Sequence, residues 1–292
     1  MGNVKGRNFD QSCVHSEKLP AGQSGELIHI SRESAGWEWM SFFVRRLIQG
    51  EAWATQNDRE EMGLVVLGGR CRADWGQGQR SIGLRKHVFD GFPYALYLPP
   101  GSRLSIEAET DCELAVCTIP SEARLEPRLI TPEDVQASLR GGGNASRQIV
   151  DVMKPEFPAD KLMMVEVYTP SGNWSSYPPH KHDVHNPPAE VDLDEIYYYR
   201  IDREAGYAYQ SLYKRSGGDG VTLAVTDGDA VLVHDGYHPV VAGHGYNVYY
   251  LNCLAGSARS LANTEDPNHV WVRSTWKTLD PRLPMVHGAE ER

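Results

Sequence analysis

Histidine and acidic side chains gather in residues 172–200, which read GNWSSYPPHKHDVHNPPAEVDLDEIYYYR. His180 and His182 stand two residues apart, and in an extended segment such side chains point to the same face. Glu195 begins the apolar run EIYYY, and His238 follows later within DGYHP. Three imidazoles and one carboxylate suit Zn, Mn, Fe, Ni or Cu ions rather than Ca or Mg. The sequence therefore predicts one transition-metal ion held by these four side chains.

Several neighbours of these residues are alternative ligands. His185 comes just before Pro187 and Pro188, which should turn the chain away, so we expect it beside the site or in solvent. Glu195 is the preferred carboxylate because it adjoins an apolar strand, where a side chain is held in place. The competing acidic residues, which we assign to a solvated loop, are Glu190, Asp192 and Asp194. The alternative for the whole set is an H-K-H segment on a solvated loop, with His238 elsewhere.

Arginine and tyrosine side chains near this stretch could bind an anionic substrate. Arg200 and Arg215 are preferred over Lys214 because the planar guanidinium matches a carboxylate, and Tyr199 is expected to join them. Ordinary surface charge on strands is the alternative for each cation. Tyr237, next to His238, could donate a hydrogen bond or simply pack.

The composition restricts the class of partner. The chain of 292 residues has a formal net charge of -10 at pH 7, which argues against nucleic acid and an anionic membrane surface. Its five cysteines are odd in number and include no C-x-x-C pair, which indicates reduced thiols in a cytoplasmic protein. The N-terminus lacks the apolar core of a signal peptide, and no run reaches membrane-spanning length.

Most of the chain reads as short strands separated by turns. Runs such as EMGLVVLGG, CELAVCTI and EIYYYRID are rich in β-branched and aromatic residues and are bounded by turn residues, which is typical of antiparallel sheets. Residues 90–101 and 227–236 share an order of acid-Gly, apolar strand and Gly-ended turn, which hints at an internal repeat. An all-β fold is therefore predicted, and only the second repeat is soon followed by a candidate metal-binding histidine.

One segment, Thr131–Arg140, carries the signals of a short helix. Thr131 is a plausible cap, Pro132 suits the first turn, and two acidic residues follow. Gly141-Gly142-Gly143 comes next, and we place a boundary between two halves near residues 130–146. The predicted parts are a surface arm at 1–24, two halves at 25–140 and 145–265, and a tail at 266–292 that packs back on a barrel or on a partner subunit.

The order of H-x-H, Glu and a later Gly-x-His resembles the metal site of cupins, which are small β-barrels. The interval between His182 and Glu195 is longer than is usual in cupins, and the last motif is shorter. Both departures fit the 5-deoxy-glucuronate isomerases of bacterial inositol breakdown. GNWSSYPPHKHD, EVDLDEIYYYR, GYHPVVA and RKHVFDGFPYALYLPPG are similar to that family. The resemblance extends from about Leu27 to Pro284.

This resemblance implies a bicupin, with two jelly-roll β-barrels, a few short helices and a single metal ion in the C-terminal barrel. It implies a metal-dependent aldose–ketose isomerase that converts 5-deoxy-D-glucuronate to 5-dehydro-2-deoxy-D-gluconate in myo-inositol catabolism. The cofactor would be one divalent ion of Zn, Mn, Fe or Ni. Glu195 and Tyr237 would have catalytic roles, and Arg200 or Arg215 would hold the C6 carboxylate. The residue that acts as the proton-transfer base is not assigned.

The expected protein is a cytoplasmic homo-oligomer that acts on a small sugar acid. Three other functions use the same ligand pattern: a uronate ketol-isomerase of the pectin-breakdown type, a cupin dioxygenase, and a sugar-acid-binding cupin without turnover. Oxygen consumption would favour the dioxygenase, and binding without conversion would favour the last.

Overall fold

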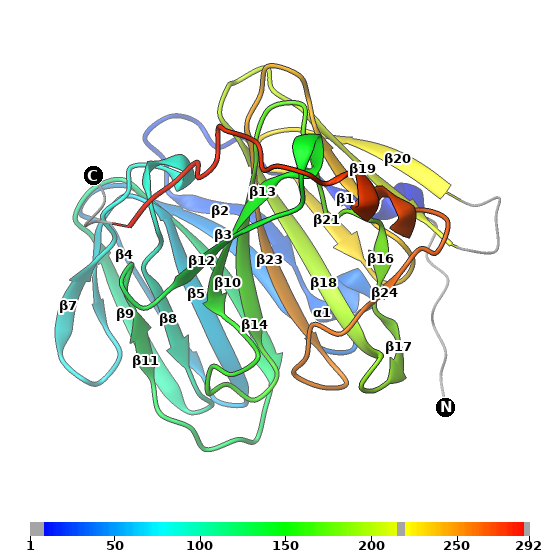
Figure 1. Cartoon of the computed structure of the whole chain (residues 1–292). Helices are drawn as coiled ribbons and strands as arrows, with labels where there is room; N and C mark the ends of the chain where they lie inside the picture. The colour runs from blue at the N-terminus through cyan, green and yellow to red at the C-terminus, as the bar shows by residue number, and fades with distance from the viewer. Residues whose placement is uncertain (1–8, 215–219, 289–292) are drawn as a thin grey trace. The chain divides into compact units, whose positions relative to one another are not determined.

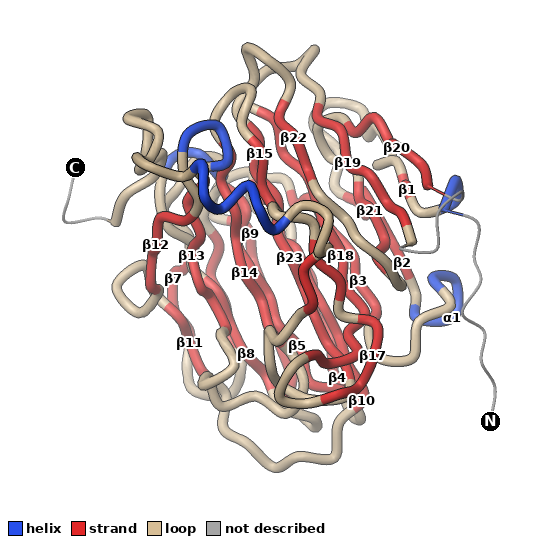
Figure 2. Tube along the Cα trace, turned by 45° about the vertical axis from the view of Figure 1, so that its right-hand side comes forward, coloured by secondary structure: helices blue, strands red, loops and turns tan. Residues whose placement is uncertain are grey.

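Strands make up most of the regular structure in this computed structural model, which describes residues 9–214 and 220–288 (Figure 2). The helical segments are short: α1 (Arg32–Ala35), η1 (Phe9–Gln11), η2 (Val88–Asp90), η3 (Gly143–Ala145) and η4 (Val270–Thr275). Within the described ranges, every helix is too short to span a bilayer. The predicted all-β class is confirmed.

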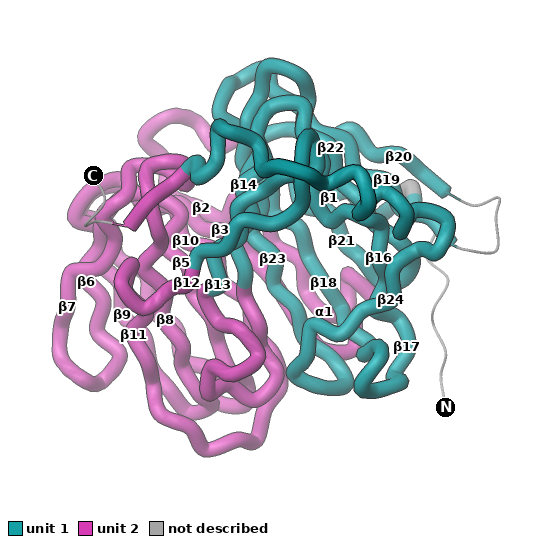
Figure 3. The backbone as a smooth tube through the Cα atoms, viewed as in Figure 1, with its two compact units in different colours: residues 1–15, 137–151, 165–285 teal, residues 16–136, 152–164, 286–292 magenta. Residues whose placement is uncertain are grey.

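The chain divides into two compact units, which Figure 3 colours separately. Unit 1 comprises Met1–His15, Ala137–Asp151 and Val165–Met285, and unit 2 comprises Ser16–Gln136, Val152–Met164 and Val286–Arg292. The contiguous halves expected at 25–140 and 145–265 therefore differ from these units: residues 152–164 belong to unit 2, and 266–285 of the expected tail belong to unit 1. The chain passes from one unit to the other at 136–137, 151–152 and 164–165. These points lie within strands, and no Gly or Pro marks them in the sequence.

Unit 2 contains a six-stranded and a four-stranded sheet (Figure 1). The six-stranded sheet has the order β11 (Arg128–Ile130), β8 (Ala95–Leu98), β5 (Glu60–Gly68), β10 (Cys112–Pro120), β3 (Ser41–Leu47) and β2 (Gly25–Ile30). The four-stranded sheet has the order β4 (Ala52–Asn57), β9 (Ser102–Ala108), β6 (Cys71–Asp74) and β7 (Gln79–Ile82).

Unit 1 holds most of the remaining strands. The large sheet has the order β1 (Cys13–Val14), β21 (Ala230–Val233), β18 (Glu190–Ile201), β23 (Val248–Gly256), β14 (Met163–Thr169), β13 (Arg147–Met153) and β12 (Gln136–Arg140), and β17 (Asp183–Asn186) pairs with β18. The smaller sheets are β15 (Trp174–Ser175), β22 (Val240–Ala242), β19 (Ala208–Tyr213) and β20 (Gly220–Val225), and the pair β16 (His180–Lys181) and β24 (Thr264–Glu265).

The two units repeat one strand order. The large sheets share the order β8-β5-β10-β3-β2 and β21-β18-β23-β14-β13, and the small sheets share β4-β9-β6-β7 and β15-β22-β19-β20. The strands that correspond also follow one another in the same order along the chain. The stretches 90–101 and 227–236 contain β8 and β21, so the repeat expected from the sequence matches strands that correspond in the topology.

The repeat differs where the first strand of the small sheet passes to the large sheet. In unit 2, β4 connects to β5 through residues 58–59, whereas in unit 1 residues 176–189 lie between β15 and β18 and include β16 and β17. This inserted segment carries the H-K-H motif. Unit 2 has no such segment, and its interior is packed with apolar side chains, among them Leu64, Val66, Leu96, Ile106 and Leu114.

The helix predicted at Thr131–Arg140 is wrong. Thr131 begins a tight turn in which its backbone N and its hydroxyl both donate to Asp134 Oδ2, each at 2.8 Å. The chain then extends as β12 (Gln136–Arg140). Capping residues specify only a first turn, and so short a segment propagates no helix without a packed apolar face. Pairing in the large sheet therefore decides its conformation.

The expected surface arm contains a strand. β1 pairs with β21 through Cys13↔Val231 and Val14↔Ala230, which adds an edge strand to the large sheet of unit 1. Two residues are too few to show the alternation that reveals a strand in a sequence. Residues 1–8 of the arm lie outside the described residues.

Candidate metal centre and substrate pocket

Alternation along β18 places the carboxylate Glu195. Side chains of a strand alternate between its faces, so Glu195 shares one face with Tyr197 and Tyr199, which belong to the buried core of unit 1. The strand pairs on both sides, through Glu195↔Val233 and Glu195↔Leu254. Glu195 is only 4% exposed, so its carboxylate is held by the sheet, as its position at the start of EIYYY predicted.

The inserted segment supplies two histidines. β16 pairs with β24 through His180↔Glu265, which ties the start of the motif to the C-terminal segment. Leu193 N donates to the carbonyl of His182 at 3.0 Å, and the ring Nδ1 of His182 donates back to Leu193 O at 3.3 Å. Lys181 between them donates to Asp183 and to Glu190 instead, as expected for a side chain on the other face.

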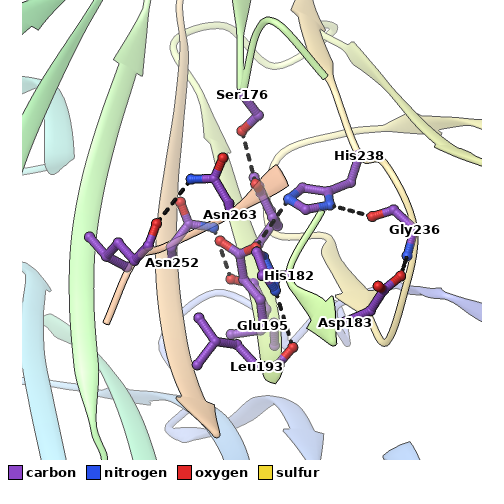
Figure 4. A network of polar contacts seen from close by, with 12 residues as sticks. Ser176, His182, Asp183, Leu193, Glu195, Gly236, His238, Asn252 and Asn263 are labelled. Atoms are coloured by element: carbon purple, nitrogen blue, oxygen red, sulfur yellow. Dashed lines mark hydrogen bonds and ion pairs between the residues drawn. The ribbon is translucent and has the colours of Figure 1, made fainter. Parts of the chain in front are cut away.

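His238 is positioned by the turn that follows β21. Gly236 has a φ of 82°, and a Cβ there would lie 2.6 Å from Tyr213 O, so the turn requires glycine. His238 Nδ1 donates to Gly236 O at 3.0 Å. The ring is completely buried, and its Nε2 faces the Glu195 carboxylate (Figure 4).

The four predicted ligands converge. Ring nitrogens of His180, His182 and His238 lie within 4.8 Å of one another. Glu195 Oε2 is 2.8 Å from His182 Nε2 and 3.3 Å from His238 Nε2, and Figure 4 shows these three side chains pointing toward one another. Donor atoms ~2.1 Å from one ion stand roughly 3.0–3.4 Å apart when they are neighbouring ligands. The two Glu195–histidine distances lie near this range, so the four side chains are close enough to share a single ion.

The hydrogen bonds of the rings support the same conclusion. A carbonyl oxygen only accepts, so Nδ1 of His182 and of His238 carries the hydrogen, and a neutral ring then presents a lone pair at Nε2. His238 Nε2 is buried and makes no hydrogen bond within the described residues. A cation between these nitrogens and the Glu195 carboxylate would satisfy both, so the donor set fits a divalent transition metal.

The surroundings of the site also determine the protonation states of its side chains. Burial lowers the pKa of His180 well below its ordinary 6.5, and the neighbouring His238 and His182 lower it further, which keeps the ring neutral and able to bind a metal. Burial alone would raise the pKa of Glu195, but the hydrogen bond from His182 and the neighbouring imidazole of His238 outweigh burial and lower the pKa to about 2. The carboxylate is therefore ionised at neutral pH.

His180, His182 and Glu195 line part of a cavity of about 390 Å³ in unit 1, a volume that suits a small molecule. Alternate residues of four neighbouring strands face it: Leu193, Glu195 and Tyr197 of β18, Tyr250, Asn252 and Leu254 of β23, Val165 and Val167 of β14, and Arg147, Ile149 and Asp151 of β13. The C-terminal segment adds Glu265, Arg273 and Trp276. This part of the expected tail therefore helps to form the pocket.

Three hydroxyl groups meet in the same cavity. Ser176 Oγ lies 2.8 Å from Tyr197 OH and 3.2 Å from Tyr250 OH. Ser176 has a φ of 48° and is the only non-glycine residue with positive φ in the described ranges. Such a backbone costs energy and is found most often in functional sites. These hydroxyls can exchange hydrogen bonds with the hydroxyl groups of a ligand.

Three residues predicted for substrate binding or catalysis, Tyr199, Arg200 and Tyr237, do not line the cavity in the described structure. Arg200 Nε donates to Asp227 Oδ1 at 2.8 Å, and Tyr199 OH donates to Gln210 at 2.7 Å. Tyr237 is fully buried with its ring centroid 5.2 Å from that of Tyr213. Arg215 lies outside the described residues. Tyr199 and Arg200 are too far along β18 from Glu195, and Tyr237 alternates away from His238.

The cations of the cavity come from segments that the sequence did not single out. Arg140, Arg147 and Arg273 line it. Arg147 opens the strand RQIVDVM, where its position on the same face as Ile149 and Asp151 was a signal of an inward-facing charge. Arg273 forms an ion pair with Glu265, and its guanidinium lies 5.0 Å from the centre of the Trp276 ring.

The alternative ligands lie outside this centre. His185 is exposed and its Nδ1 is 2.7 Å from Ser257 Oγ. Glu190 was expected in a solvated loop, yet it is 5% exposed and accepts hydrogen bonds from Lys181 and from backbone N–H groups. The described residues contain one further group that could hold a metal, formed by Cys13, His15 and Asp229.

Comparison with known proteins identifies a family and a fold. Residues 14–272 match the KduI/IolB family. A 5-deoxy-glucuronate isomerase of Geobacillus thermodenitrificans is 42% identical over 252 residues, which cover 86% of this chain and 92% of that protein. An IolB-like protein of Salmonella typhimurium LT2 has a crystal structure that matches with a TM-score of 0.86 at 36% identity, covering 90% of this chain and 99% of that one. An oxalate decarboxylase of Lactobacillus farciminis matches with a TM-score of 0.59 at 12% identity over 94% and 92% of the two chains, which is a likeness of fold alone and confirms the predicted bicupin architecture.

Proposed function

Because this chain belongs to the KduI/IolB family, we propose that it is a 5-deoxy-glucuronate isomerase. The reaction is the aldose–ketose isomerisation of 5-deoxy-D-glucuronate to 5-dehydro-2-deoxy-D-gluconate, a step of myo-inositol catabolism. The observation that supports this function beyond sequence similarity is the convergence of three histidines and one glutamate beside a cavity that also presents three arginines.

The proposed metal ligands are His180, His182, Glu195 and His238. A divalent ion held there supplies a Lewis acid that favours negative charge on two adjacent substrate oxygens, here those at C1 and C2. Zn, Mn, Fe and Ni all suit this donor set, and availability decides among them. The protein's own part is to fix the ligand rings: Leu193 O and Gly236 O orient His182 and His238 through their Nδ1–H groups.

The remaining residues of the cavity bind and orient the open-chain sugar. The hydroxyls of Ser176, Tyr197 and Tyr250 provide hydrogen bonds beside the metal ligands. The apolar side chains of Val165 and Val167 close part of the wall and keep water from the reacting carbons. The isomerisation moves the C2 proton to C1, which requires a group within hydrogen-bond reach of both carbons.

Turnover in heavy water tests the function. Purified protein is incubated with 5-deoxy-D-glucuronate in D2O, and the product is examined by NMR. We expect the ketose, with deuterium at C1, because a proton carried by a protein group exchanges with solvent. A ketose without any deuterium would indicate a hydride shift between the two carbons, and the absence of ketose would refute the proposed function.

Two variants of the same segment give a matched comparison. His182→Ala removes a proposed ligand and should lower turnover by more than about 100-fold, since groups that only support a ligand already contribute about 10- to 100-fold. His185→Ala removes an exposed imidazole three residues away and should stay within about twofold of wild type. Equal activity of the two variants would show that the proposed metal centre takes no part in the reaction. The cytoplasmic location and the homo-oligomeric state expected from the sequence stay predictions.

A further inference from the structure

Arg147 is a positive charge in the wall of the cavity. It begins β13, and its side chain faces the cavity together with those of Ile149 and Asp151. Its Nη1 donates to the carbonyl of Ala145 at 3.1 Å. None of the ion pairs found among residues 9–214 and 220–288 involves Arg147, and the groups that most favour its charge are the phenols of Tyr250 and Tyr197. The guanidinium thus keeps hydrogen-bond donors available to a ligand.

The surroundings make this charge costly in the absence of an anion. Burial lowers the pKa of Arg147, and the positive charges of Arg140 and Arg273 lower it further, while Tyr250 and Tyr197 act weakly in the opposite direction. The carboxylate of Glu265, which also lines the cavity, pairs with Arg273. Arg147 is partly buried, and a charge that is withdrawn from water without a partner is destabilising, so a ligand that brings the opposite charge would relieve this cost.

We propose that Arg147 forms the subsite that binds the carboxylate of the substrate, at the end opposite the carbons that react. The proposal rests on the proposed function and names the side chain that selects a sugar acid over a neutral sugar. A guanidinium offers a planar fork of N–H donors that fits a carboxylate in a bidentate pair. Because the chain carries a net charge of -10, an acidic substrate needs such a local cation to enter.

The sheet order places Arg147 at a suitable distance from the metal centre. β13 is the third strand from β18 in the order β18-β23-β14-β13, which is about 14 Å at about 4.8 Å per strand. An arginine side chain extends inward from one side and the metal ligands from the other, and a six-carbon chain can span the gap between them.

The experiment compares an acid substrate with an uncharged one. Values of kcat/KM are measured for 5-deoxy-D-glucuronate and for its 6-amide, with wild type, Arg147→Met and Arg200→Met. A lost hydrogen-bonded charge pair costs about 1.5–3 kcal/mol, which corresponds to about 10- to 100-fold. We therefore expect Arg147→Met to lower kcat/KM for the acid by that factor, mainly through KM, and to leave the amide unchanged.

Arg200→Met is the matched control, because Arg200 pairs with Asp227 outside the cavity. Its loss should change kcat/KM for either substrate by no more than about twofold. Arg147→Lys retains the charge without the fork and should fall between wild type and Arg147→Met. Arg147→Met should melt no lower than wild type, since it removes a partly buried charge that has no ion pair among the described residues. Equal losses for acid and amide with a lower melting temperature would assign Arg147 a structural role, and an unchanged kcat/KM for the acid would also overturn the proposal.

Failure of the isomerase function is distinguishable from failure of this subsite. If wild type converts neither substrate, the proposed function is refuted, and the subsite is judged by calorimetric titration with D-glucuronate. Binding to wild type that is lost in Arg147→Met and kept in Arg200→Met would support the carboxylate subsite. Equal binding to both variants, or no binding to wild type, would overturn it.

Discussion

The contacts of Glu195 predict how the metal-free protein responds to acid. Glu195→Gln removes the negative charge and keeps the size of the side chain. In wild type, burial favours the neutral carboxyl, but the hydrogen bond from His182 and the neighbouring imidazole of His238 outweigh it, so that the pKa is about 2 rather than the ordinary 4.5. A carboxyl whose pKa is lowered by folding stabilises the folded state above its ordinary pKa, and this stabilisation is lost as the pH falls toward the folded pKa.

Linkage gives the size of the effect. With the pKa lowered from 4.5 to about 2, ionised Glu195 contributes about 3 kcal/mol at pH 5.5 and about 2 kcal/mol at pH 3.5. The pKa of His182 changes in the opposite direction. Burial opposes its protonation, but Glu195 raises its pKa above 6.5. The stability that the folded protein gains from protonated His182 is therefore fully present below that pH and constant between pH 5.5 and pH 3.5. Wild type should therefore lose about 1 kcal/mol relative to Glu195→Gln between the two pH values.

Urea unfolding in the presence of EDTA measures this difference. The free energy of unfolding of both proteins is determined at pH 5.5 and pH 3.5, with tryptophan fluorescence as the signal. The difference between the two free energies of unfolding should be about 1 kcal/mol smaller at pH 3.5 than at pH 5.5. Parallel pH dependence of the two proteins would refute the reasoning, because Glu195 would then titrate alike in the folded and unfolded states.

Three further variants test the packing and the limits of the site. Leu64→Ala opens a cavity in the apolar core of unit 2 and should lower the free energy of unfolding by about 2–5 kcal/mol; elemental analysis should show unchanged metal content, and loss of metal would contradict a site confined to unit 1. Tyr199→Phe removes the hydroxyl that donates to Gln210, 2.7 Å away, and should lower the free energy of unfolding by about 1–3 kcal/mol. Its kcat/KM should stay within about twofold of wild type, and a large loss of turnover would show that Tyr199 belongs to the substrate pocket. Gly256→Ala places a Cβ 1.9 Å from Asp192 O and should lower the melting temperature by at least about 4 °C; an unchanged thermal melt would show that β18 and β23 can separate at that point without cost.

The sequence predicted the metal ligands because each one carries a local signal. Two imidazoles at spacing 2 in an extended segment must share a face, and a glutamate at the start of an apolar strand must be held by the sheet. The strand pairs of β18 and the turn at Gly236 then bring Glu195 and His238 together. Proximity in sequence failed for Arg200 and Tyr199, because each residue along a strand moves about 3.3 Å away from the ligands.

The cavity cations could not be predicted in the same way. Arg147 and Arg273 come from strands and turns that are distant in sequence from the histidines, and only the order of strands in the large sheet brings Arg147 to the same cavity. The short helix at Thr131–Arg140 failed because capping residues describe the start of a helix and contain no information on sheet pairing. Tertiary pairing, which the local sequence does not encode, decided both cases.

The repeated topology explains why one unit alone has the candidate site in the described structure. Corresponding strands of the two units have the same order, but the connection at residues 58–59 is a short turn, and its counterpart at 176–189 carries His180 and His182. In unit 2 the interior is filled by apolar side chains. An insertion between two strands has therefore provided the ligands, and the sheet that was already present provides Glu195.

Metal content of the purified protein tests the central claim most directly. Wild type and the double variant His180→Ala/His238→Ala are loaded with a divalent transition metal, dialysed and examined by elemental analysis. The four converging ligands predict one ion per wild-type chain and loss of that ion from the double variant. Equal metal content in the two proteins would contradict the proposed centre.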